Sequence, residues 1–238
     1  MGNLYAGTSG WSYPSWKPEF YPEKLAPKKF LNYYATRLNS VELNYTFRRF
    51  PTEKLLRGWI EETPGHFKFA VKANQKITHV SRLRNVGDFT MDFVKALQPL
   101  DENGRLACVL FQLPPFLKRD ASLLQDFLGV LPRTIRAAFE FRHESWFSED
   151  VYDALRAANA ALCEAESERM ETPEVSTADF AYLRLRKESY SAKELQKIRT
   201  RVDKLTSSGD ALVYFKHEET PEGAFCAERL LKGGAKAG

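Results

Sequence analysis

The sequence lacks the features that mark membrane, disulfide-rich or zinc proteins. Its 238 residues contain no apolar run near the ~18 residues that a membrane helix needs. Its cysteines, Cys108, Cys163 and Cys226, are few and widely separated, and they show no metal-ligand spacing. The amino terminus also lacks the basic-then-apolar pattern of a signal peptide. We therefore expect a cytoplasmic protein with no membrane association and with cysteines buried as small apolar side chains.

The sequence also lacks a large excess of either sign of charge. The chain has 35 Lys and Arg residues against 31 Asp and Glu residues, a net charge of +4, and the two signs are interspersed. A dedicated nucleic-acid binder usually carries a strongly basic stripe, so nucleic acid is not the favoured partner. We expect a small-molecule substrate instead, and the sequence carries no signal for an oligomeric state.

Alternation of strand-like and helix-like segments dominates what is present. Amphipathic helical stretches separate most of the β-like runs, although 167–178 lacks helical periodicity. This pattern predicts one α/β domain over 1–238, a single (β/α)8 TIM-type barrel with an irregular sixth unit and a frayed tail at 233–238. The predicted strands are Leu4–Thr8, Val41–Phe47, Phe67–Asn74, Leu106–Leu113, Arg136–Arg142, Ala161–Glu166, Phe180–Arg186 and Ala211–Lys216.

Most of these runs end in charged or amide side chains. The carboxyl ends of all strands in such a barrel meet at one mouth, where the chemistry of these enzymes takes place. Side chains alternate between the two faces of a strand, so one parity of each run faces the barrel interior. The predicted interior set is Glu42, Asn44, Thr46, Lys72, Asn74, Gln112, Glu140, Arg142, Glu164, Glu166, Arg184, Tyr214 and Lys216.

Glu140, Glu42 and Lys72 are the candidate catalytic residues. The two carboxylates could divide acid and base roles if their environments differ. Lys72 could contact an anion or a carbonyl group, or it could act as a Schiff-base amine. A Schiff-base lysine needs a lowered pKa, whereas the neighbouring glutamates would raise the pKa of Lys72. A purely structural role stays open for all three residues, because Glu140 could form an ion pair with Arg142, and Glu42 could form one with Lys72.

A further set of polar and aromatic side chains is expected to bind the substrate. Trp11 and Trp146 directly follow strand ends and could stack on a sugar or a base. Arg142 and Arg184 could stabilise developing negative charge, with Arg186 partly offsetting an acidic loop after the eighth strand. The predicted substrate-binding residues are Trp11, Asn44, Asn74, His79, Gln112, Arg142, His143, Trp146, Arg184 and Tyr214.

A divalent metal ion is the less favoured alternative, and no cofactor is predicted. The candidate ligands show neither His-x-His nor Glu-x-x-His spacing, and the nearby cations would repel a metal ion. Those ligands would come from His79, His143, His217, Glu42, Glu140, Glu164 and Glu166.

Several motifs resemble one known family along almost the whole chain. They are Gly7–Tyr13 with Trp16 and Phe20–Pro22, Val41–Phe47, Phe69–Asn74 with Ile77–His79, Leu110–Pro115 and Glu140–Phe147. In this order they resemble the domain of unknown function 72, the YecE-like proteins. The resemblance implies a TIM barrel, but it brings no established reaction.

The family resemblance also brings an alternative function and two departures. Its similarity in shape to metal-dependent repair endonucleases and sugar isomerases implies, as the alternative, a nucleic-acid-binding or endonuclease-like protein. Family members often carry His-Gly after the seventh strand and paired asparagines after the eighth. Here those positions hold Arg186-Lys187 and Lys216-His217. The leading expectation is an enzyme that acts on a small polyhydroxy or anionic, sugar-like substrate.

Overall fold

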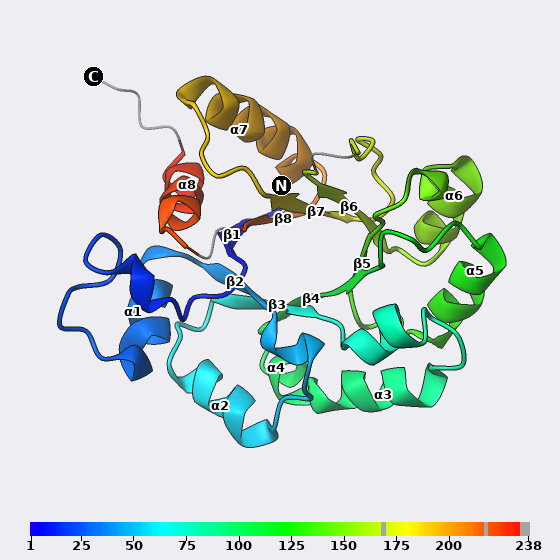
Figure 1. Ribbon diagram of the computed structural model, residues 1–238, viewed down its shortest axis with the longest axis horizontal. Helices are drawn as coiled ribbons and strands as arrows, with labels where there is room; N and C mark the ends of the chain where they lie inside the picture. Colours follow the sequence, from blue (N-terminus) through cyan, green and yellow to red (C-terminus); the bar gives the residue numbers. More distant parts are fainter. Residues whose placement is uncertain (168–169, 217–218, 234–238) are drawn as a thin grey trace.

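Eight parallel strands form the centre of the molecule, and helices surround them (Figure 1). The computed structural model describes residues 1–167, 170–216 and 219–233. The single sheet has the order β1-β8-β7-β6-β5-β4-β3-β2. This is the TIM-type barrel that the strand-like runs predicted. Its strands are β1 Leu4–Thr8, β2 Ser40–Leu43, β3 Lys68–Lys72, β4 Leu106–Gln112, β5 Ala137–Glu140, β6 Ala161–Ala165, β7 Phe180–Leu185 and β8 Asp210–Phe215.

The helices begin where the sequence supplies caps. The Thr52 hydroxyl accepts a hydrogen bond from the Leu55 N–H at 3.2 Å, and Ser191 with Glu194 forms a capping box. The α-helices are α1 Phe30–Arg37, α2 Glu53–Glu61, α3 Gly87–Ala96, α4 Gln98–Glu102, α5 Ala121–Val130, α6 Glu149–Ala157, α7 Ala192–Thr206 and α8 Glu222–Leu231. Short helical segments are η1 Pro14–Trp16, η2 Pro27–Lys29, η3 Tyr45–Phe47, η4 Lys76–Val80 and η5 Glu144–Trp146.

The sixth unit is irregular, as predicted. Among the described residues between β6 and β7, which are 166–167 and 170–179, there is no helix. A frayed tail was expected at 233–238, and residues 234–238 of it lie outside the described residues. No helix in the described ranges is long and apolar enough to cross a membrane.

Apolar packing separates an inner and an outer layer. Mostly small side chains, together with Phe180, Tyr182 and Tyr214, fill the barrel interior, and most of the large aromatic side chains pack between the strands and the helices. Cys108 and Cys163 are each 1% exposed inside the barrel, which confirms that they are buried apolar groups. Charged side chains therefore lie toward the two ends of the barrel, with Lys68, Arg136 and Asp210 at the amino end and a second group at the carboxyl end.

The seam between β1 and β2 closes the barrel largely through side chains. An isolated bridge joins Ser9 to Glu42 there. The Tyr34 hydroxyl accepts a hydrogen bond from the Thr8 N–H at 2.8 Å and donates one to the Ser40 carbonyl at 3.0 Å. The strands approach so closely that a Cβ on Gly7 would lie 1.8 Å from the Ser40 oxygen. Gly7 therefore allows the seam to close.

The interior parity predicted for β6 is wrong. Ala161, Cys163 and Ala165 face the interior, and Glu164 points outward to form an ion pair with Arg201 of α7. Small side chains satisfy the packing of the interior at this strand, and the charge finds a partner on the covering helix. The strand predicted over Val41–Phe47 also ends early, at Leu43, where the chain turns toward η3.

Gly7→Ala is expected to destabilise the fold by about 3 kcal/mol, since the new methyl group would have to push the seam apart. The matched control is Gly58→Ala on α2, where a Cβ meets nothing within 4 Å. That change should leave stability equal or raise it by up to about 1 kcal/mol, because alanine favours helix. Urea unfolding of both variants would measure the two effects. Equal stabilities would contradict a tightly closed seam.

Candidate functional site

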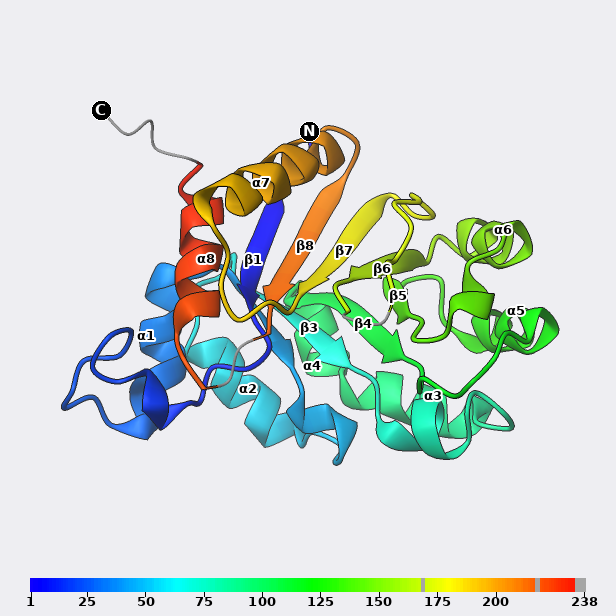
Figure 2. The same cartoon turned by 45° about the horizontal axis from the view of Figure 1, so that its top comes forward.

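A cavity of about 490 Å³ opens at the mouth formed by the carboxyl ends of the strands. Figure 2 shows the strand arrows running toward this end of the barrel. The residues of the cavity wall come from the ends of β3, β4 and β7 and from the segments that follow β2, β5 and β8. They are Asn44, Tyr45, Phe47, Arg48, Arg49, Lys72, Gln112, Arg142, Arg184, Arg186 and Lys216. We call this cavity the mouth pocket.

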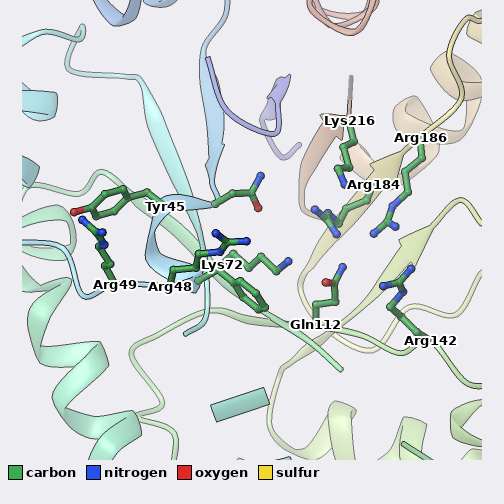
Figure 3. Close-up of a pocket in the computed structure, with 11 residues that line it drawn as sticks. Tyr45, Arg48, Arg49, Lys72, Gln112, Arg142, Arg184, Arg186 and Lys216 are labelled. Carbon is green, nitrogen blue, oxygen red and sulfur yellow. The ribbon is translucent and has the colours of Figure 1, made fainter. Parts of the chain in front are cut away.

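The wall of the mouth pocket is strongly cationic. Seven of its lining residues are Arg or Lys, and none of the eleven is Asp or Glu. Figure 3 shows Arg48 and Arg49 on one side and Arg184, Arg186 and Lys216 on the other. Like charges crowded around one concave space repel one another, and an anion placed among them lowers that repulsion.

Arg184 forms the floor of the pocket and is 1% exposed. Its Nη2 donates to Glu42 Oε1 at 2.7 Å, and its Nη1 donates to Glu140 Oε2 at 2.5 Å. One guanidinium thus joins β7 to β2 and β5. Because all three charged groups are buried, they are stable only while they remain paired.

Neighbouring side chains complete the coordination of both carboxylates. Glu42 accepts hydrogen bonds from the Ser9 and Tyr182 hydroxyls, each at 2.6 Å. Glu140 accepts one from Gln112 Nε2 at 2.8 Å and one from Arg186 Nη2 at 2.6 Å. The Arg142 Nε lies 4.0 Å from Glu140 as well, so the predicted Glu140–Arg142 pair exists as a longer contact.

The pKa values of the two glutamates follow from this coordination. Burial alone would raise the pKa of Glu140, but Arg184, Arg186 and Gln112 outweigh it and lower the value to about 2. Arg184, Ser9 and Tyr182 likewise outweigh burial and lower the pKa of Glu42. Both groups are ionised near neutral pH and fully engaged. This arrangement favours positioning of Arg184 and Arg186 over the proton transfer predicted for the glutamates.

Two guanidinium groups of the pocket retain an unused donor. Within the part of the chain that the structure describes, the buried Nε atoms of Arg184 and Arg186 have no hydrogen-bond partner. Buried polar groups normally have a hydrogen-bond partner, and a buried donor without a partner costs about 1–3 kcal/mol of stability.

Lys72 differs from the sequence-based expectation. Its amine lies 4.2 Å from the centre of the Phe47 ring, and no ion pair with Glu42 is present. Burial lowers its pKa most, with Arg184 and Lys216 contributing, and these effects outweigh Glu42 and Glu140 to give a value of about 8. The glutamates do raise this pKa, as expected, but the expected net rise is wrong because burial and the neighbouring cations outweigh them.

Four of the predicted substrate-binding residues do line the mouth pocket: Asn44, Gln112, Arg142 and Arg184. Of the rest, Tyr214 faces the barrel interior as predicted, but it lies among apolar side chains and its hydroxyl is 2.7 Å from Ser40 Oγ. His79 packs edge-on against Phe47 at 5.0 Å, and burial together with Lys72 and Arg142 lowers its pKa.

The remaining predicted contacts lie outside the wall of the pocket. Trp146 is fully buried, stacks on Phe141 and donates to the Leu117 carbonyl, so it presents no free face for a ligand. Trp11 packs edge-on against Trp59 of α2, with its ring 5.3 Å away.

Asn74 and His143 both serve local turns. The Asn74 side chain donates to the Thr46 carbonyl at 3.1 Å and accepts from the Lys76 N–H. His143 Nδ1 accepts from the Ser145 N–H at 3.2 Å and so caps η5. Local backbone hydrogen bonds account for the positions of both side chains.

Sequence reasoning missed a substantial part of the site. Arg48 and Arg49 follow the Val41–Phe47 run directly, and two successive arginines after a predicted strand were an available signal. Lys216 and Arg186 were noted only as an interior residue and a compensating charge. Tyr182, which bonds Glu42 across the barrel, carried no signal beyond its interior parity.

Metal binding gains no support from the described residues. They contain no group of three or more His, Cys, Asp and Glu side chains that could hold a metal ion. Glu42 and Glu140 bind arginine, Glu164 pairs with Arg201, and Glu166 accepts from the Arg186 N–H and the Tyr190 hydroxyl. His217, another predicted ligand, lies outside the described residues.

The fold and the site define an α/β barrel with a cationic pocket at its mouth. The model of the family described as "Protein of unknown function DUF72" matches residues 5–236, and the chain belongs to that family, as its motifs predicted. It is 32% identical to the UPF0759 protein YunF of Bacillus subtilis and 31% identical to the UPF0759 protein YecE of Escherichia coli, over 63% and 61% of this chain. The matches cover 54% and 51% of those relatives, about half the length of each.

Solved structures agree with the fold. A DUF72 family protein from Thermotoga maritima superposes with a TM-score of 0.87 at 28% identity, covering 97% of this chain and 98% of that one. An AP endonuclease of family 2 from Brucella melitensis superposes with a TM-score of 0.54 at 10% identity, covering 99% and 97%. The second likeness concerns the fold alone.

Glu140→Gln is expected to destabilise the protein by about 3–5 kcal/mol at pH 7, since Arg184 and Arg186 lose a buried counter-charge. The control is Glu53→Gln, whose exposed pair with Arg57 on α2 contributes roughly 0.3–0.5 kcal/mol. Denaturant unfolding would compare the two variants.

The cost of Glu140→Gln should also depend on pH. The folded-state pKa of Glu140 is lowered to about 2 from an ordinary 4.5, so its stabilisation is complete above pH 4.5 and is lost as the pH falls toward 2. The difference between wild type and variant should shrink across that range. A difference that stays constant from pH 6 to pH 2 would rule out the ion network as its source.

Proposed function

We propose that the mouth pocket binds a small anionic, sugar-like compound, such as a phosphorylated polyhydroxy molecule, and that the protein acts on it as an enzyme. The seven cationic side chains around one cavity carry this proposal. Phosphate and carboxylate groups are the usual partners of such arginine clusters, because guanidinium forks match their geometry. The volume of about 490 Å³ also falls within the range of small-molecule pockets, roughly 300–1,000 Å³.

The individual residues then take distinct roles. Arg184 and Arg186 contact the anionic group from the floor, held in place by Glu140 and Glu42. Asn44 and Gln112 offer amide groups for hydroxyls at the wall. The glutamates position these cations, and the cations stabilise negative charge that develops on the substrate.

Nucleic-acid binding is the second candidate, because its phosphates would suit the same cations. Two observations count against it. The cations surround a single concavity in place of an extended track. Trp11 and Trp146, the predicted base-stacking residues, pack against other aromatic side chains. A small ligand therefore accounts better for the geometry.

A thermal-shift panel would test the proposal with glucose, glucose 6-phosphate, inorganic phosphate and a short single-stranded DNA. At a hundred times its dissociation constant a ligand stabilises by about 2.7 kcal/mol, which corresponds to roughly 5–10 °C for a chain of this size. Shifts with the phosphates and none with glucose are expected. A shift with DNA alone, falling steeply with salt, would favour the second candidate, and no shift with any anion would contradict both.

Arg48→Ala is expected to weaken phosphate binding about tenfold, because a charge-assisted hydrogen bond contributes roughly 1.5 kcal/mol. Arg48 is exposed at the rim, so the fold should be unaffected. Arg57→Ala is the matched control, since that arginine pairs with Glu53 on α2 and does not line the pocket. Calorimetric titration would measure both affinities. Equal losses in the two variants would point to a general effect of net charge.

A further inference from the structure

We propose that the Lys72 amine forms an imine with the carbonyl carbon of an anionic aldehyde or ketone held in the mouth pocket. The inference rests on the proposed function, because the cationic walls supply the substrate. It adds a substrate class, a carbonyl compound that bears a phosphate or carboxylate group, and a covalent role for one residue. Lys72 would then be a catalytic residue, since its nitrogen bonds to the substrate.

The position of Lys72 carries the argument. It is the last residue of β3, and Figure 3 shows its side chain reaching from the β3 wall into the pocket, between Arg48 and Gln112. The face of the Phe47 ring lies beside the amine, 4.2 Å from ring centre to Nζ. The amine therefore stands among the groups that would hold an anion.

The Lys72 amine also has no counter-charge paired with it among the described residues. Glu42 and Glu140, the nearest predicted counter-charges, are bound to Arg184 at 2.7 and 2.5 Å. No hydrogen bond or ion pair to another described residue engages Nζ of Lys72. A group fixed in a salt bridge would have to break it before reacting, whereas this nitrogen would not.

The protonation state suits a nucleophile. With a pKa of about 8, set by burial and by the cations Arg184 and Lys216, roughly one-tenth of Lys72 is neutral at pH 7. A lysine with the ordinary pKa is neutral in only about one molecule in 2,500 at that pH. The arginines of the wall stay protonated and cannot attack a carbonyl group.

The reaction balances without a further reactant. The neutral amine attacks the carbonyl carbon to give a carbinolamine, and a carbon–nitrogen double bond then replaces the original carbon–oxygen double bond. The nitrogen loses its two protons, and the oxygen leaves with both as water. The resulting imine, once protonated, withdraws electrons from the neighbouring carbon and so eases bond cleavage or proton loss there.

The test is reductive trapping with two probes that differ in charge. The protein is incubated with pyridoxal 5′-phosphate or with pyridoxal, the same aldehyde without phosphate, and sodium cyanoborohydride then reduces the imine to a stable secondary amine. Peptide mass spectrometry locates and counts the modified lysines. Lys72 should be labelled at least about tenfold faster than the exposed Lys54 of α2, with half-maximal rate near pH 8.

Two variants control the assignment. Lys72→Arg keeps the positive charge and removes this nucleophile, so the fast labelling at position 72 should disappear while pyridoxal 5′-phosphate still shifts the melting temperature. Lys54→Arg should leave the labelling of Lys72 unchanged. If Lys72→Arg unfolds the protein, the pH profile of wild-type labelling at Lys72 still decides the question.

The possible outcomes separate this inference from the proposed function. Fast labelling of Lys72 by the phosphorylated probe and slow labelling by pyridoxal supports both. Equal labelling by the two probes supports the imine and counts against an anion-binding pocket. A thermal shift with the phosphorylated probe, with Lys72 labelled no faster than Lys54, overturns the imine and leaves anion binding in place. If the phosphorylated probe gives no thermal shift and Lys72 is not labelled preferentially, both the imine and the proposed function are overturned.

Discussion

The organisation of the barrel mouth depends on one buried guanidinium, that of Arg184. Its ion pairs with Glu42 and Glu140 join three strands across the interior, and all three side chains are 2% exposed or less. Burying these charges is costly, and only their mutual contacts offset the cost. The registers of β2, β5 and β7 are therefore coupled, because a shift in any one would leave a charge unpaired.

The same interaction determines the charge of the mouth pocket. Two carboxylates lie beneath the floor, where they neutralise Arg184 and part of Arg186. Arg142 lies 4.0 Å from one of them, and no Asp or Glu is among the described residues that line the wall itself. The glutamates thus lie where they fix the geometry of the floor, and the cations line the cavity above them. This separation concentrates positive charge in the pocket although the chain as a whole is only +4.

The sequence predicted the barrel well, because helical periodicity, caps and strand-like runs are local signals. The alternation of side chains along each strand correctly placed Glu42, Glu140 and Arg184 in the interior. It failed for Glu164 because the partner of that carboxylate, Arg201, lies on a helix 37 residues later, and local patterning does not show which face receives the charge. It also could not show that the chain turns at Leu43, which brings Arg48 and Arg49 over the pocket.

The pKa of Lys72 shows most clearly why composition around a site does not give its electrostatics. Counting neighbours sets several glutamates against the amine and predicts a raised value. The structure reverses this prediction, since burial disfavours the ammonium form most and Arg184, which lies between those carboxylates, opposes their effect. The arginine that stabilises the two anions thus also helps to keep the lysine partly neutral. The ion pairs at the floor and the lowered pKa of Lys72 at the wall are consequences of one arrangement of charges.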